Sequence, residues 1–201
     1  RMAGLSHELR TPLTRIRLEL ELARREGASV SRLDRVEQDV ERFDAMLREM
    51  LELSQLEMVG ETLVRRELVD LAGLVQCVLD EVDTGDVELR GAGTATVDPR
   101  LVSRLVRNLL ANAAEHAPGS RRWVEVADGQ LVVGDDGLGI PTCEHDQVWA
   151  PFRRGDGSVG HGLGLAIVAR VAELHGGSVS LSKPPGLVVT VRFDHPATGS
   201  R

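Results

Sequence analysis

The chain has 201 residues, of which 42% are hydrophobic, 27% charged and only 2% aromatic, and its formal net charge is −7. This length predicts one or two domains, and the composition excludes a disordered or fibrous chain. The acidic balance argues against a nucleic-acid-binding protein, which usually presents a basic face. No apolar run approaches the roughly 20 residues of a membrane helix. Two isolated cysteines, Cys77 and Cys143, predict neither a disulfide nor a metal site.

Residues 1–57 carry a helical pattern, because apolar residues recur there at spacings of three and four. The first stripe comprises Leu9, Leu13, Ile16, Leu20 and Ala23, and the second, a heptad seam, comprises Leu33, Val36, Val40, Phe43, Leu47 and Met50. Between them, Gly27 suits a helix C-cap and Ser31 an N-cap, which predicts a helical hairpin. One hairpin buries little core, so we expect two copies to form a four-helix bundle, and therefore a homodimer.

The rest of the chain, residues 62–201, alternates β-rich runs with helical patterns. The β-rich runs lie at 64–70, 86–89, 95–97, 123–127, 131–134, 178–182 and 187–193, and the helical patterns at 71–82, 99–116 and 163–175. This mixture predicts an α/β sandwich in which helices cover a mixed sheet. Residues 141–162 lack periodicity and are too long for an ordinary connection, which predicts a functional lid. The expected fold is thus α+β, with a hinge at residues 58–61.

A histidine near the start of the chain is a candidate nucleophile. Helical spacing places His7 about 200° around the axis from Leu5 and Leu9, so it points to solvent. A neutral imidazole has a ring nitrogen free to attack phosphorus. Glu8 could accept a hydrogen bond from the other ring nitrogen, and Thr11, one turn later, could orient a water molecule. An exposed histidine without a function is the alternative.

Four segments of the second region could line a nucleotide site, although no Walker-type GxxxxGK[ST] motif is present. Asn108 and Asn112 share one helix face, and their amide oxygens suit Mg²⁺. Asp135 follows a strand and could accept a hydrogen bond from an exocyclic amine, while Gly137 and Gly139 allow close approach of the backbone. Taken singly, these are equally well explained as surface asparagines and an ordinary turn.

The other two segments lie in and after the predicted lid. Gly160, Gly162, Leu163 and Gly164 lead into a helix, whose first N–H groups suit phosphate. Within the lid, Phe152 could dock against the domain and Arg154 could meet phosphates. A flexible loop and a solvated arginine are the alternatives.

Together these motifs resemble a known family. Ser-His-Glu-Leu-Arg-Thr-Pro-Leu, beginning at Ser6, resembles the H-box of histidine kinases of the dimerisation and histidine-phosphotransfer type. The four later segments, in this order, resemble the N, G1, F and G2 boxes of the ATPase fold of histidine kinases, type II topoisomerases, mismatch-repair ATPases and a chaperone family. The upstream H-box selects the histidine kinases among these.

The resemblance implies a role for each matching residue. His7 would accept a phosphoryl group from ATP, while Glu8 and Thr11 would serve kinase and phosphatase chemistry respectively. Asn108 and Asn112 would hold Mg²⁺ and Asp135 would read adenine. The motif glycines would shape the pocket and lid, and His116 would line the nucleotide.

The resemblance also implies partners and a location. The phosphoryl group would pass to an aspartate of a response-regulator receiver domain, and the chain would be the cytoplasmic part of a bacterial sensor, reaching the membrane only through segments N-terminal to it. Two positions depart from the family pattern. Glu115 stands where many relatives carry Lys or Arg, so ATP binding is weakened or Arg154 compensates, and Ala150 stands where relatives are usually acidic. A catalytically weak ATP-binding dimeric regulatory module and a phosphatase-dominant sensor are therefore the alternatives.

Overall fold

The computed structural model describes residues 16, 18, 30–58, 60, 63–82, 85–153, 161–182 and 185–194. The chain divides into two compact units, Arg1–Glu52 and Leu53–Arg201. Five predicted site residues lie outside the described residues: His7, Glu8, Thr11, Arg154 and Gly160. So does the first predicted helix, apart from residues 16 and 18. Within the described ranges, no helix is long and apolar enough to cross a membrane.

Helix α2 spans Val30–Met58, as the heptad spacing predicts for the second helix of the hairpin. The seam is only partly covered in the single chain. Val40 is 41% exposed, and Phe43, Leu47 and Met50 are half-buried. Met46, next to the seam, is buried.

A five-stranded mixed sheet forms the centre of the second unit, in the order β2-β4-β5-β7-β6. Its strands are β2 (Val87–Gly91), β4 (Arg122–Ala127), β5 (Gln130–Asp135), β6 (Ser178–Leu181) and β7 (Leu187–Arg192). Strand β2 is parallel to β4, and the other neighbours are antiparallel. A separate antiparallel pair joins β1 (Glu67–Asp70) to β3 (Thr94–Val97).

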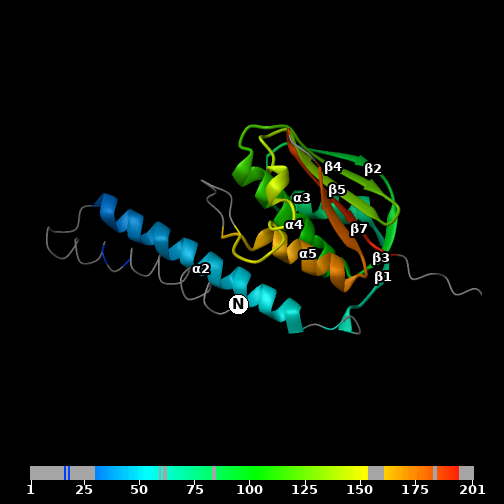
Figure 1. Cartoon of the computed structure of the whole chain (residues 1–201), viewed down its shortest axis with the longest axis horizontal. Helices are drawn as coiled ribbons and strands as arrows, with labels where there is room; N and C mark the ends of the chain where they lie inside the picture. Colours follow the sequence, from blue (N-terminus) through cyan, green and yellow to red (C-terminus); the bar gives the residue numbers. More distant parts are fainter. Residues whose placement is uncertain are drawn as a thin grey trace, which may run out of the picture. The chain divides into compact units, whose positions relative to one another are not determined.

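Three helices lie together beside this sheet, namely α3 (Leu71–Glu81), α4 (Pro99–His116) and α5 (Gly164–Leu174) (Figure 1). The strands alternate between buried and more exposed residues, as expected when one face is covered. On β4, for example, Val124 and Val126 are buried while Glu125 is exposed. Helix α4 supplies a continuous apolar stripe to the core: Val102, Leu105, Val106, Leu109, Leu110 and Ala113.

Aspartate caps fix the starts of two helices. The Asp70 carboxylate accepts a hydrogen bond from the Ala72 N–H at 3.1 Å, at the start of α3. The Asp98 carboxylate accepts one from the Arg100 N–H at 3.1 Å, and Pro99 occupies the first turn of α4, where a missing N–H is tolerated. Asp70 is the last residue of β1 and Asp98 directly follows β3, so each strand-to-helix turn is marked in the sequence by an aspartate.

All seven β-rich runs and all three helical patterns of the second region are found as strands and helices. The main difference is at β1, which begins at Glu67 rather than at residue 64. Its partner β3 ends at Val97, where the chain turns into α4. The Arg65 N–H therefore donates to the Asp98 carboxylate, at 3.2 Å, instead of to a strand. The predicted mixed sheet covered by helices is confirmed.

Candidate functional site

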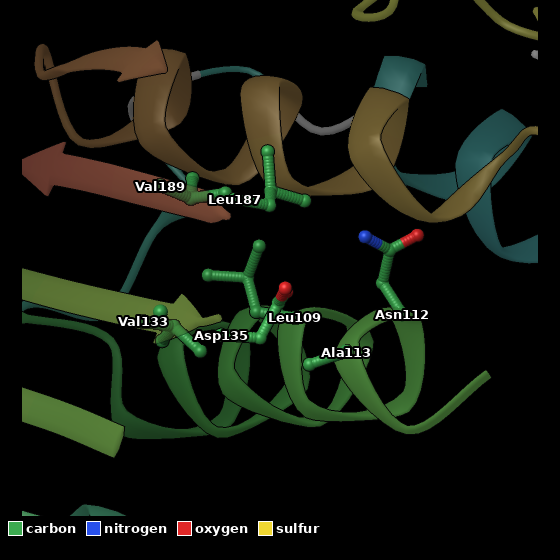
Figure 2. A pocket seen from close by; sticks show the side chains of 8 residues that line it. Leu109, Asn112, Ala113, Val133, Asp135, Leu187 and Val189 are labelled. Atoms are coloured by element: carbon green, nitrogen blue, oxygen red, sulfur yellow. The ribbon is translucent and has the colours of Figure 1, made fainter. Parts of the chain in front are cut away.

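A narrow pocket lies between α4 and the strands β5 and β7 (Figure 2). It is lined by Leu109, Asn112, Ala113, Val133, Gly134, Asp135, Leu187 and Val189. Asn112 and Asp135 are the only lining residues with polar side chains, and Figure 2 shows both beside the same apolar walls. The volume is about 10 Å³, room for roughly one water molecule, so a flat aromatic ligand can enter only if the walls separate.

Asp135 is the one charged side chain at this pocket, and it is 4% exposed. It ends β5, where the strand register places it opposite Leu187 of β7 and Arg122 of β4. One carboxylate oxygen, Oδ1, accepts a hydrogen bond from the Gly137 N–H at 2.9 Å. This bond fixes the carboxylate at the mouth of the turn, where it can accept a further hydrogen bond from a ligand amine.

Hydrogen bonds to Arg121 and Gly186 hold the start of the loop after Asp135. The Arg121 N–H donates to the Asp136 carboxylate at 2.7 Å, and the Asp136 N–H donates back to the Arg121 carbonyl at 3.2 Å. The Gly186 N–H donates to the Gly137 carbonyl at 2.8 Å. Gly139 has φ of +73°, and a Cβ there would lie 2.3 Å from the Gly186 carbonyl oxygen. Glycine is therefore required at this position, as its place in the motif predicts.

The two predicted asparagines lie on the expected face of α4, but only one lines the pocket. Asn112 borders it directly. Asn108, one turn earlier, donates its Nδ2 hydrogen to the Arg104 carbonyl at 3.0 Å, which directs its Oδ1 away from that carbonyl. The Oδ1 atom lies 3.5 Å from where a Cβ on Gly164 would be. Asn108 thus faces the first residue of α5, and its oxygen is available to a ligand there.

The start of α5 has the predicted glycine-rich entry. Leu163 is fully buried and accepts a hydrogen bond through its carbonyl from the Ile167 N–H at 3.0 Å. Gly162 has φ of +70°, and no side chain caps the helix. The first turn of α5 therefore offers N–H groups and the positive end of the helix dipole, a favourable environment for phosphate.

The described end of the predicted lid, at Phe152 and Arg153, contacts Gly162. The Phe152 N–H donates to the Gly162 carbonyl at 2.9 Å, and a Cβ on Gly162 would lie 2.4 Å from the Arg153 carbonyl oxygen. Phe152 is half-buried and has φ of +64°, a conformation that is uncommon for an aromatic residue. The lid begins with the short helix η2 (Thr142–Glu144).

Within the second unit, the structure thus brings most described candidate residues around α4, β5 and the start of α5: Asn108, Asn112, Asp135, Gly137, Gly139, Gly162, Leu163 and Gly164. His116 and the departing residue Glu115 are exposed in the last turn of α4, and neither lines the pocket. Leu187 was not a candidate, because only the pairing register with β5 reveals that it faces Asp135.

Two family models match the chain. Residues 97–197 match the "Histidine kinase-, DNA gyrase B-, and HSP90-like ATPase" model, and residues 2–58 match the "His Kinase A (phospho-acceptor) domain" model. The second match overlaps the predicted hairpin, and the first overlaps the larger part of the predicted sandwich.

Curated relatives point in the same direction. The sensor histidine kinase MtrB of Mycolicibacterium paratuberculosis is 35% identical over 217 residues, and the sensor histidine kinase GtrS of Pseudomonas aeruginosa is 33% identical over 201 residues. These matches cover 96% and 95% of this chain but 38% and 41% of the relatives. The chain therefore spans about two fifths of their length.

Solved structures support the fold. The mycobacterial sensor histidine kinase MprB matches 64% of this chain and 96% of its own, with a TM-score of 0.56 and 31% identity. The Acinetobacter baumannii histidine kinase AdeS matches 94% of this chain and 98% of its own, with a TM-score of 0.69. At 24% identity, the AdeS match supports the fold alone.

Proposed function

Because the chain belongs to the sensor histidine kinase family, whose ATPase domain binds ATP, we propose that it transfers the γ-phosphoryl group of ATP to His7 and then to a response-regulator aspartate. One observation carries the proposal: Asp135 and Asn112 line one apolar pocket, and Asn108, one turn before Asn112, faces the first residue of α5. The apolar pocket with its one carboxylate would suit the adenine base, and the glycine-rich start of α5 would suit the phosphates.

The adenine base would enter between α4 and β7. Its exocyclic amine would donate to the Asp135 carboxylate, which the Gly137 N–H already orients. Leu109, Val133 and Leu187 would pack against the ring faces, since apolar walls with one convergent polar group are typical of ligand pockets.

The triphosphate would extend from this pocket towards α5. Asn108 and Asn112 would supply amide oxygens to Mg²⁺, which would offset the charge on the phosphates when bound. Gly162, Leu163 and Gly164 would present backbone N–H groups, and Arg154 and Gly160 would complete the lid.

His7 would perform the chemistry as a neutral imidazole. A ring nitrogen would bond to the γ-phosphorus as the bond to the bridging oxygen breaks and ADP leaves. Glu8 would accept a hydrogen bond from the N–H of the other ring nitrogen and stabilise the positive charge that develops on the ring. A carboxylate oxygen of the receiver domain would then attack the phosphorus and break the P–N bond. Thr11 would orient the water that removes the phosphoryl group from the regulator.

The half-buried seam of Phe43, Leu47 and Met50 on α2 supports a homodimer, because a second hairpin would cover it. Residues 1–57 would form the dimeric hairpin, 58–61 the hinge and 62–201 the catalytic domain. By its likeness to sensor histidine kinases, the chain would act as the cytoplasmic part of a membrane-anchored sensor.

The test uses γ-³²P-labelled ATP and the full chain. Label should appear on the wild type and be absent from His7→Gln. Label that persists in His7→Gln rejects the assignment. If the wild type binds ATP but incorporates no label, the result favours a catalytically weak regulatory module, in which the acidic Glu115 side chain disfavours the phosphates.

A further inference from the structure

Two buried polar side chains outside the nucleotide pocket form a connected pair. Asp98 is 2% exposed and His175, at the C-terminus of α5, is 3% exposed. The Asp98 N–H donates to His175 Nε2 at 2.9 Å, and His175 Nδ1 donates to the Val171 carbonyl at 2.7 Å. The ring is therefore neutral with a fixed tautomer. Burial lowers the pKa of His175, with nearby Arg66 adding to this and Asp98 opposing it.

The pair reaches the segment between α2 and β1. The Asp98 carboxylate caps α4 through Oδ1 and also accepts the Arg65 N–H through Oδ2, at 3.2 Å. The next residue, Arg66, donates from its guanidinium to the Leu174 carbonyl at 2.8 Å, one residue before His175. Two successive residues of this connecting segment are thus tied to the start of α4 and to the end of α5.

The end of α2 is tied to the same helix. Arg170 Nε donates to the Leu56 carbonyl at 3.1 Å, and Leu56 is 2% exposed. Contacts to residues 56, 65 and 66 therefore converge on the last turns of α5 and on its neighbour Asp98. The opposite end of α5 is Gly164, which Asn108 faces. An 11-residue helix spans about 16 Å, and buried Ile167 and Val171 hold it to the core as one body.

We propose that Asp98, His175, Arg66 and Arg170 form a positioning joint that fixes the segment from the end of α2 to β1 on the helix that shapes the phosphate end of the nucleotide site. None of these residues lines the nucleotide pocket, so their role would be positioning. They act by holding the segment that follows α2 in one position on the nucleotide-binding domain. This inference rests on the proposed function, because its kinetic consequence is the transfer of phosphoryl to His7.

The first test separates binding from transfer in the full chain. Arg66→Met and Arg170→Met each remove one tie of the joint while retaining an apolar stem. We expect autophosphorylation kcat to fall about tenfold in each, with the Kd for ATP changed less than about twofold. Arg192→Met is the matched control, since Arg192 is exposed on β7 and its guanidinium donates to the Gln130 side chain at 3.3 Å, not to any group of the joint. It should change neither quantity. An unchanged kcat in both joint variants overturns the proposal.

The second test does not depend on phosphorylation. Hydrogen exchange of the Arg65 amide reports its bond to Asp98 directly. Adding ADP with Mg²⁺ to the full chain should slow this exchange at least fivefold. His175→Leu should abolish that effect, and His175→Gln, whose amide oxygen can accept the Asp98 N–H, should restore it. The joint is refuted if nucleotide slows exchange in the first turn of α5 but leaves the Arg65 amide unchanged. If the wild type binds nucleotide but His7 is not labelled, the proposed function is rejected. The hydrogen-exchange experiment still tests the joint in that case.

Discussion

Replacing Asp135 with asparagine isolates the contact that would select the base. Asn keeps the size of the side chain, and its Oδ1 can still accept the Gly137 N–H hydrogen bond seen at 2.9 Å. What changes is the second oxygen, which becomes an NH₂ group and would face the amine of adenine, donor against donor. A hydrogen bond to a charged group contributes about 1.5–3 kcal/mol. At 1.4 kcal/mol per factor of ten, this predicts roughly a 10–150-fold weaker Kd for ATP.

Titration calorimetry with ATP and with inosine triphosphate tests this reasoning. Inosine carries a carbonyl oxygen in place of the amine, so the wild type should prefer ATP. Asp135→Asn should lose or reverse that preference, because its NH₂ group can donate to the carbonyl. Asp136→Asn is the control: Asp136 is exposed and points to the Arg121 N–H, so its substitution should change ATP affinity less than about twofold. Equal ATP affinities for Asp135→Asn and the wild type would refute the assignment of Asp135 to the base.

Two further predictions concern stability. Gly139→Ala should lower the free energy of unfolding in urea by roughly 2–5 kcal/mol, because it combines a positive φ with a 2.3 Å approach to the Gly186 carbonyl. Gly119→Ala is the control, because Gly119 also has a positive φ, +78°, but a Cβ there would meet no atom within 4 Å. It should lower the free energy of unfolding by only about 1–2 kcal/mol. Equal losses in the two variants would contradict the clash at Gly139. The buried, neutral His175 has a lowered pKa, so the unfolded chain binds its proton first, below about pH 6.5. Stability should therefore fall with pH below that value, by up to about 1.4 kcal/mol per pH unit from this group, and the fall should be shallower in His175→Gln. If the free energy of unfolding depends on pH in the same way in the wild type and in His175→Gln, this contribution is excluded.

The element pattern of the second unit is largely readable from its sequence, because its strands alternate and two of its helices, α3 and α4, begin at aspartate caps. Val124 and Val126 flank exposed Glu125, and Asp98 followed by Pro99 marks the start of α4. The β1 boundary was misplaced, since Arg65 looks like a continuation of the strand until its bond to Asp98 is known.

The placement of the candidate residues was predictable where it depends on local spacing and hidden where it depends on strand pairing. Asn108 and Asn112 share a helix face whatever the tertiary structure. Leu187 reaches the pocket only because β7 pairs with β5 in one register, and a shift of one residue would turn it to the other face. No sequence motif marks His175 for the same reason, because its partner Asp98 lies 77 residues earlier in the chain.

The central claim is that nucleotide held at α4 and β5 supplies the phosphoryl group for His7. Incubation of the full chain and of its Asn112→Ala variant with γ-³²P-labelled ATP, followed by acid and alkali treatment and peptide mapping, tests it most directly. The account predicts an alkali-stable, acid-labile label on the peptide that contains His7, reduced at least tenfold in Asn112→Ala. An acid-stable label, or undiminished labelling of the Asn112→Ala variant, would contradict it.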